Sequence, residues 1–198
     1  MFDPVARFET PVCVRVAGLG EPFDEQVAAR IRENVLAVGL RLDKWADCRP
    51  NAMAFITHDP QTTFETIRSK RPWLINWPAW REYSLTSLKA QLAARAPAVS
   101  WSMFDVWFPD NGALLAGQPP ANGFWGWNSG QMPALGGRRR GIAIALVDAK
   151  RIEGDRVHQL ADFLTIHLLG SPRVATNASE AGVPTILSLF DGDPARAP

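Results

Sequence analysis

One histidine and one carboxylate near the end of the chain have a spacing that could bind a metal ion. Residues 158–162 read HQLAD, and apolar side chains recur around them at helical intervals. Side chains four residues apart share one face of a helix, so His158 and Asp162 could both reach one ion. Zinc accepts nitrogen and oxygen ligands of this kind, and His58 is the candidate third ligand. The competing interpretation is an exposed pair near the start of a helix.

This stretch lacks the group that would make a metal site catalytic. In the HExxH motif two histidines bind zinc, and the glutamate takes a proton from the bound water. Gln159 occupies the glutamate position, and an amide does not accept a proton at neutral pH. We therefore predict a degenerate site formed by His158, Gln159 and Asp162, with no catalytic residue and no cofactor. The alternative is an atypical metal-dependent hydrolase that binds zinc through His158 and Asp162.

The order of elements around this helix resembles that of metzincin-type zinc peptidases. A strand, a helix, a strand, an irregular region, an edge strand and a further strand precede the helix in both. Residues 183–190 (VPTILSLF) are similar to the methionine-containing turn that follows the zinc helix of those enzymes, and Leu187 stands near the methionine position. The resemblance implies a zincin-like fold with His158 as the first ligand. It places Asp162 at the second ligand and Leu168 at the third, which implies that the zinc site is lost.

The chain also resembles an uncharacterised proteobacterial family of secreted proteins. The similarity rests on residues 48–51 (CRPN), 148–154 and 159–163. It implies a bacterial protein of the cell envelope. Together with the degenerate helix, it implies a pseudoenzyme that binds a peptide or a protein partner.

Tryptophan is frequent in this chain, with eight residues against one tyrosine. Trp101 and Trp107 lie on one face of an expected strand. Trp125 and Trp127 lie in a Gly- and Pro-rich stretch whose apolar residues show no periodicity. Aromatic side chains on a polar loop suit stacking on a sugar, a peptide or a partner protein. They could line a cleft for a peptide or protein, form a carbohydrate-binding module through Trp125 and Trp127, or cover the core as a lid. The binding candidates are Trp101, Trp107, Trp125, Trp127 and Asn128.

Three further sets of polar residues have plainer interpretations. The arginines of residues 138–140 form the only basic run, and we expect a solvated loop end. Arg30 and the neighbouring arginines are expected to form the solvated face of an amphipathic helix. His167 lies among leucine and isoleucine, and we expect a partly buried histidine with a hydrogen-bond partner.

Apolar periodicity predicts the elements that would position these residues. Alternation and short apolar runs indicate strands, and spacings of three and four indicate helices. The order predicts a single domain over residues 1–198, of the α/β or α+β class, with a mixed twisted sheet and packed helices. The expected strands are residues 11–18, 52–57, 99–108 and 141–148, the expected helices are 22–42, 62–69, 79–94 and 155–170, and the irregular parts are a long Gly/Pro/Trp-rich loop inserted over 109–140 and a tail over 171–198.

Composition argues against two classes of partner. The 198 residues carry a net charge of +1, which gives no field to attract nucleic acid. The apolar runs are too short to cross a bilayer.

The first residues have neither the basic start nor the apolar core of a signal peptide. No feature of the sequence defines an oligomeric state.

The two cysteines indicate the compartment. Cys13 lies in an expected strand and Cys48 lies just before the next one, and adjacent strands would bring them within bridging distance. One pair without a CxxC motif favours a structural disulfide over a redox or zinc site. We therefore predict a Cys13–Cys48 disulfide and a periplasmic or secreted location. The alternative is two buried free thiols in a cytosolic protein.

Overall fold

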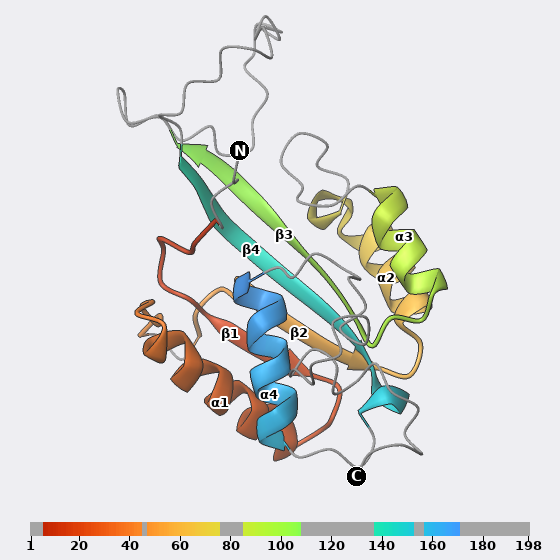
Figure 1. Ribbon diagram of the computed structural model, residues 1–198, viewed down its shortest axis with the longest axis horizontal. Coiled ribbons are helices and arrows are strands. Elements are labelled where there is room, and N and C mark those ends of the chain that lie inside the picture. The colour runs from red at the N-terminus through yellow and green to blue at the C-terminus, as the bar shows by residue number, and fades with distance from the viewer. Residues whose placement is uncertain (1–5, 45–46, 76–84, 108–136, 153–156, 171–198) are drawn as a thin grey trace, which may run out of the picture.

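The computed structural model describes five segments of the chain, which form one sheet covered by helices (Figure 1). The described residues are 6–44, 47–75, 85–107, 137–152 and 157–170. In chain order the elements are β1 (Val14–Ala17), α1 (Phe23–Ala37), β2 (Ala52–Thr57), α2 (Pro60–Lys70), the 3-10 turn η1 (Pro72–Leu74), α3 (Leu85–Ala93), β3 (Ala98–Trp107), β4 (Gly137–Asp148), the 3-10 turn η2 (Ala149–Arg151), α4 (Val157–Thr165) and the π-helical turn η3 (Ile166–Gly170).

The sheet is mixed, as predicted, and its strand order is β1-β2-β4-β3. The strands β1, β2 and β4 run parallel to one another, and β3 runs antiparallel to β4 at one edge. The last strand of the described residues is therefore an inner strand, because β4 is inserted between β2 and β3. Figure 1 shows β3 and β4 continuing as a two-stranded arm past the ends of β1 and β2.

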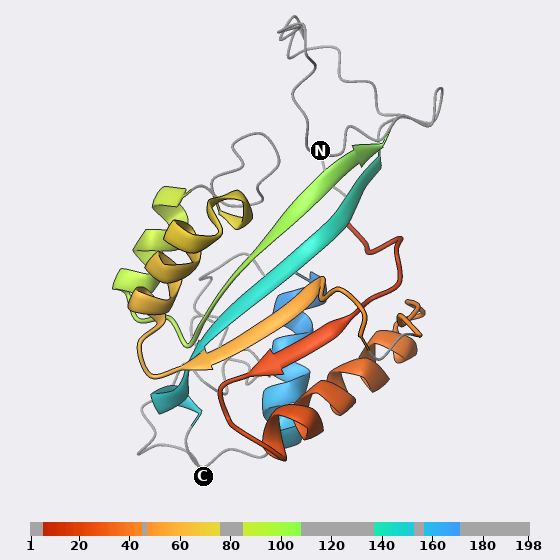
Figure 2. The same cartoon turned by 180° about the vertical axis from the view of Figure 1, so that it is seen from behind.

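The two faces of the sheet are covered by different helices because successive strand residues point to opposite faces. In β4, Ala143, Ala145 and Val147 belong to the core beneath α1 and α4. Ile144 and Leu146 belong to a second core beneath α2 and α3. Accordingly, α4 lies in front of the sheet in Figure 1 and behind it in Figure 2. No helix of the described segments has both the length and the apolar character that crossing a membrane requires.

Local signals explain where two helices begin and end. The carboxylate of Asp59 accepts a hydrogen bond from the backbone N–H of Thr62 at 3.0 Å and thereby caps α2, which begins at Pro60. We predicted that the first helix extends over residues 22–42, but α1 ends at Ala37. Gly39 follows with a φ of +78°, a left-handed conformation that glycine adopts at little cost, and this turns the chain out of the helix.

The strand predictions are mostly confirmed, with one correction. β2 has the predicted bounds, residues 52–57. β4 begins at Gly137, so the last four residues assigned to the long loop belong to a strand. The polar run of residues 138–140 gave no strand signal, but the backbone N–H of Arg140 donates to the carbonyl of Arg7 at 2.9 Å. The rest of that loop and the predicted tail lie outside the described residues, as do the first two residues of the last predicted helix, 155 and 156.

The predicted disulfide between Cys13 and Cys48 is present, and their Cα atoms are 6.0 Å apart. Cys13 lies just before β1, and Cys48 lies in the segment that leads to β2. Asn51 adds hydrogen bonds at the same place, because its side-chain oxygen accepts from the Cys13 N–H at 2.8 Å and its amide donates to the Pro11 carbonyl at 3.0 Å. The disulfide therefore closes a loop that contains the whole of α1.

Candidate functional site

The residues of the degenerate metal motif lie on α4, which packs against α1 and the sheet (Figure 1). Leu160, Ala161 and Leu164 form the buried face of α4. On the other side, His158 is exposed and the side chain of Asp162 is 33% exposed. The helical spacing thus holds, and the two polar residues lie away from the core.

Asp162 is bound by two residues of α1. Its Oδ1 accepts from Asn34 Nδ2 at 2.7 Å and from Arg30 Nε at 3.0 Å, and its Oδ2 lies 3.5 Å from Arg30 Nη2. Asn34 also donates to Thr165 Oγ1 at 3.0 Å. Arg30, which we expected on a solvated face, has a side chain that is 36% exposed and is paired with Asp162. Arg30, Asn34, Asp162 and Thr165 form a polar link between α1 and α4, which we call the α1–α4 link.

This link changes the ionisation of the carboxylate. Partial burial by itself would raise the pKa of Asp162, but the hydrogen bonds from Asn34 and Arg30 and the charge of Arg30 outweigh it. The pKa of Asp162 is therefore lowered from its ordinary value. Conversely, the hydrogen bond to Asp162 is the largest of the effects that raise the pKa of Arg30. The pair is fully ionised at neutral pH.

The donor set around His158 does not fit a zinc site. One oxygen of Asp162 already accepts two hydrogen bonds, so metal binding there would require the α1–α4 link to break. The described residues contain no group of three His, Cys, Asp or Glu side chains that could hold a metal ion, so His58 is not brought to His158 and Asp162. Gln159 is half-buried beside His158 and offers an amide where a base would be needed.

Trp101 is a core residue. It is 1% exposed, its indole N–H donates to the Leu74 carbonyl at 2.9 Å, and its ring packs edge-on against Phe64 with centroids 5.8 Å apart. It does not line a cleft, in contrast to our expectation. The side chain of Trp107, and Trp125, Trp127 and Asn128 altogether, lie outside the described residues.

On the opposite face of β3, a buried polar pair joins the strand to the last helical turn. Ser100 Oγ is hydrogen-bonded to His167 Nδ1 at 3.0 Å, and the imidazole packs at a tilt against the Phe163 ring, with ring centroids 4.5 Å apart. Burial lowers the pKa of His167 to about 4. The prediction of a buried histidine with a partner is confirmed. Two serines at alternate positions of an otherwise apolar strand were the sequence signal for such a partner.

Arg140 is buried as well, although we expected it at a solvated loop end. It is 1% exposed, and its Nη1 donates to Ser102 Oγ at 2.6 Å and to the Leu168 carbonyl at 2.8 Å. Its guanidinium carbon also lies 5.9 Å from the centre of the Phe8 ring. Arg140 therefore connects β3, β4, η3 and the N-terminal segment. Because this buried cation is hydrogen-bonded to a backbone carbonyl and a hydroxyl group, we assign Arg140 a structural role.

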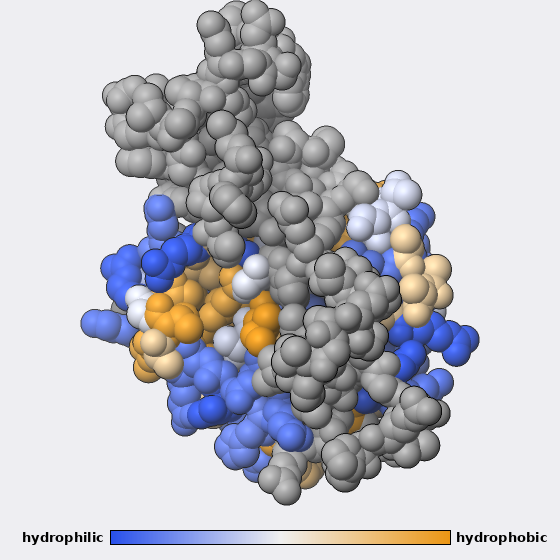
Figure 3. Space-filling view, viewed as in Figure 1, coloured by the Kyte–Doolittle hydropathy of each residue, from blue (hydrophilic) through white to orange (hydrophobic). Residues whose placement is uncertain are grey.

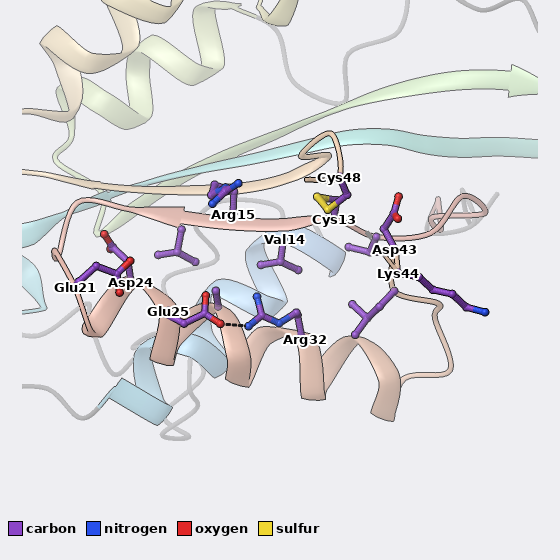
Figure 4. Close-up of a pocket in the computed structure, with 14 residues that line it drawn as sticks. Cys13, Val14, Arg15, Glu21, Asp24, Glu25, Arg32, Asp43, Lys44 and Cys48 are labelled. Carbon is purple, nitrogen blue, oxygen red and sulfur yellow. Dashed lines mark hydrogen bonds and ion pairs between the residues drawn. A yellow bond between two sulfur atoms is a disulfide. The ribbon is translucent and has the colours of Figure 1, made fainter. Parts of the chain in front are cut away.

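A groove of about 440 Å³ runs between the outer edge of β1 and α1 (Figure 4). We call it the β1 groove. Its wall on α1 includes the ion pair between Glu25 and Arg32 and the small side chain of Ala28. One end is formed by the disulfide and the segment after α1. The lining residues are Val12, Cys13, Val14, Arg15, Val16, Glu21, Asp24, Glu25, Ala28, Arg32, Leu42, Asp43, Lys44 and Cys48.

Apolar side chains gather at a second surface, over the C-terminal ends of α1 and α4 (Figure 3). Leu36 and Val38 are 56% and 52% exposed there. Nothing in the described part of the chain shows what would cover them, so we assign no function to this patch.

Comparison with known proteins returned no relative. No protein-family model matches the chain, and neither a curated protein nor a solved structure matches it. A function for this chain must therefore be argued from its own residues.

Proposed function

We propose that this chain is a non-catalytic binding protein of the bacterial cell envelope, built on a scaffold similar to that of zinc peptidases. The observation that best supports this proposal is that Asp162 accepts hydrogen bonds from Arg30 and Asn34. At the position where a zinc peptidase needs a metal ligand, this chain uses a carboxylate to tie two helices together. Gln159 at the position of the base supports the same conclusion.

The arrangement of the strands supports the proposed scaffold. β3 is an antiparallel edge strand, its neighbour β4 runs parallel to β2, and α4 is the next α-helix after β4 among the described elements. An edge strand followed by a strand that leads into the zinc helix is the order on which the resemblance to metzincin-type peptidases rests. We therefore propose that the chain keeps the strand order of those peptidases, whereas the site on α4 has a different role.

The disulfide supports the proposed location. Disulfides persist in oxidising compartments and are rare in the cytosol. Cys13 is 3% exposed and is bonded to Cys48 beside the hydrogen bonds of Asn51, which is the setting of a structural bridge. We therefore propose a periplasmic or secreted protein.

The partner that we propose is a peptide or a protein. Burial of Trp101 removes one wall of the cleft that the sequence suggested, whereas the β1 groove is a cavity formed by described residues. It has a strand edge on one side and charged side chains on the other. Such a surface can bind the main chain of an extended polypeptide.

The proposal is tested by metal content and peptide hydrolysis. The oxidised protein and its His158→Ala variant are dialysed against zinc and then against buffer, and bound zinc is measured by elemental analysis. We expect no stoichiometric zinc that depends on His158, and no cleavage of unstructured casein by either protein. The variant His58→Ala tests the candidate third ligand, an exposed histidine that is not on α4.

One result would overturn the proposal. Stoichiometric zinc and casein cleavage, both lost in His158→Ala, would establish a metal-dependent hydrolase, and their loss in His58→Ala as well would make His58 the third ligand. Zinc that is bound equally by all three proteins depends on neither exposed histidine, and the absence of cleavage is then the deciding result.

A further inference from the structure

We propose that the β1 groove binds an extended peptide that adds as a strand to the outer edge of β1 and places a cationic side chain at Glu21. The inference rests on the proposed function, because it names the site and the class of ligand that a binding protein of this kind would use. Three features of the molecule support it: the hydrogen-bonding pattern of β1, the walls of the groove and the charges that line the groove.

The backbone of β1 presents bonding groups to the groove at alternate residues. Cys13 faces β2, because its carbonyl accepts from the Ala52 N–H at 3.1 Å. Val12 faces the other way, because its N–H donates to the Arg41 carbonyl at 2.7 Å and its carbonyl accepts from the Asp43 N–H at 2.9 Å. In a parallel sheet the direction of these groups alternates along the strand. Val14 and Val16 therefore point their N–H and carbonyl groups to the groove side.

A short stretch of the chain already uses this edge. Leu42 forms a parallel bridge with Val12, and the described residues include no strand that continues the ladder beside Val14 and Val16. A strand edge with free N–H and carbonyl groups is a template for another chain. The four residues Val14–Ala17 span about 13 Å at the usual rise per residue, which is room for a peptide of three to four residues.

The wall on α1 leaves space for a second backbone. Ala28 faces the groove with a single methyl group, and the ion pair between Glu25 and Arg32 lies on α1 along the same wall (Figure 4). The floor is apolar, because the side chains of Val14 and Val16 belong to the core beneath α1. A strand laid along β1 would therefore find bonding groups on one side and small or paired side chains on the other.

The charges of the groove differ between its ends. Glu21, Asp24 and Glu25 lie at the C-terminal end of β1, and Arg32 is paired with Glu25 (Figure 4). The other lining cations are Arg15 on β1 and Lys44 at the opposite end of the groove. Asp24 caps the turn after β1, with its carboxylate 2.9 Å from the Leu19 N–H and 3.1 Å from the Gly20 N–H. Glu21 is exposed and has room for a partner, so a lysine or arginine of the ligand suits this end.

The test uses three acetylated and amidated heptapeptides in which valine alternates with lysine, glutamate or serine. Hydrogen exchange of the amides of Val14 and Val16 is measured by NMR on the full chain with its disulfide intact, at up to about 1 mM peptide. We expect protection of both amides by the lysine peptide, weaker protection by the serine peptide and none by the glutamate peptide. A lysine peptide methylated at every backbone nitrogen keeps the charge but has no N–H to donate on either edge, so it cannot form the ladder and should give no protection.

Two variants of matched charge test the role of Glu21. Glu21→Gln and Ala90→Lys each add one positive charge, but Ala90 is exposed on α3 and does not line the groove. We expect Glu21→Gln to weaken binding of the lysine peptide about two- to fivefold, as an exposed charge pair does, and Ala90→Lys to leave it unchanged.

The outcomes separate the inference from the proposed function. Equal effects of the methylated and unmethylated peptides, protection at another surface, or no protection of Val14 and Val16 by any peptide would overturn the inference and leave the proposed function standing. Cleavage of the lysine peptide in the presence of zinc, lost in His158→Ala, would overturn the proposed function, whatever the result at Val14 and Val16.

Discussion

The imidazole of His167 is buried against Phe163, and its Nδ1 is hydrogen-bonded to Ser100. Burial disfavours the charged ring because the protein interior solvates a cation poorly, and the pKa of His167 falls from its ordinary 6.5 to about 4. The folded protein therefore holds this ring neutral over a pH range in which the unfolded chain binds a proton. This single residue couples folding to pH.

The sign of that coupling gives a prediction. The contribution of His167 is fully present above pH 6.5 and is lost as the pH falls toward 4, because the unfolded state takes up a proton first. The loss amounts to about 3 kcal/mol over this range. Urea unfolding at several pH values should show this slope in the wild type and in His58→Gln, and a flatter dependence in His167→Gln. An identical slope in His167→Gln would contradict the assignment.

The sequence predicted some site residues and not others for a physical reason. The spacing of His158 and Asp162 on one helix face is a local property, and the structure confirms it. The partners of Asp162 are 128 and 132 residues away in the chain, and no local pattern identifies Asn34 or Arg30 as those partners. The burial of Arg140 is equally nonlocal, because it depends on Ser102 and Leu168.

At the scale of elements, the α1–α4 link joins the first and last helices of the described chain. These helices cover the same face of the sheet, and their apolar sides form one core. The link makes the alignment of the two helices more specific, because Asp162 can bond to both Arg30 and Asn34 in one register of α4 along α1. We infer that the link fixes how α4 lies along α1.

Removing the carboxylate should cost a measurable part of the stability. Asp162→Ala leaves two donors of α1 without their acceptor, and we expect the Tm to fall by about 2–4 °C. Glu33→Ala is the matched control, because Glu33 also bonds to Arg30 but is 68% exposed, and we expect a change of less than about 1 °C. Equal shifts in the two variants, measured by calorimetry, would show that the link is no more than a surface contact.

The elements themselves were largely predictable, because strands and helices in this chain carry strong local patterns. β2 was predicted with its observed bounds, and the helix predicted over residues 62–69 is present as α2, which extends over Pro60–Lys70. The start of β4 was not predictable, because Arg140 is an inward-facing strand residue of a type that normally marks a surface. The order of strands in the sheet is a tertiary property and required the structure.

For the whole molecule, the disulfide is the covalent constraint that the described residues show. It joins positions 35 residues apart and closes the loop that carries α1 against β1 and β2. Closing a loop of this length removes conformational freedom from the unfolded chain and contributes about 3–4 kcal/mol in the chain-entropy model. The β1 groove has the disulfide at one end, so its shape depends on the same bond.

The corresponding prediction concerns the double variant Cys13→Ala with Cys48→Ser. We expect a loss of unfolding free energy of about 3–4 kcal/mol, with the fold retained at low temperature. Far-UV circular dichroism should confirm the retained helices, and chemical denaturation should give the loss. Reduction of the wild type should reproduce it. A variant with wild-type stability would show that Asn51 and the β1–β2 pairing hold the segment without the bond.

The insertion of β4 between β2 and β3 also determines when the chain can fold during synthesis. Residues 13–48 precede β4 in the chain, so the loop that the disulfide closes can form before β4 has been synthesised. The sheet cannot be completed then, because the inner strand ends only at Asp148. Until that residue arrives, the apolar strand β2 has an uncovered edge, which is a hazard for aggregation. In a nascent chain of this topology the edge of β2 therefore stays open until the residues up to Asp148 are available for pairing.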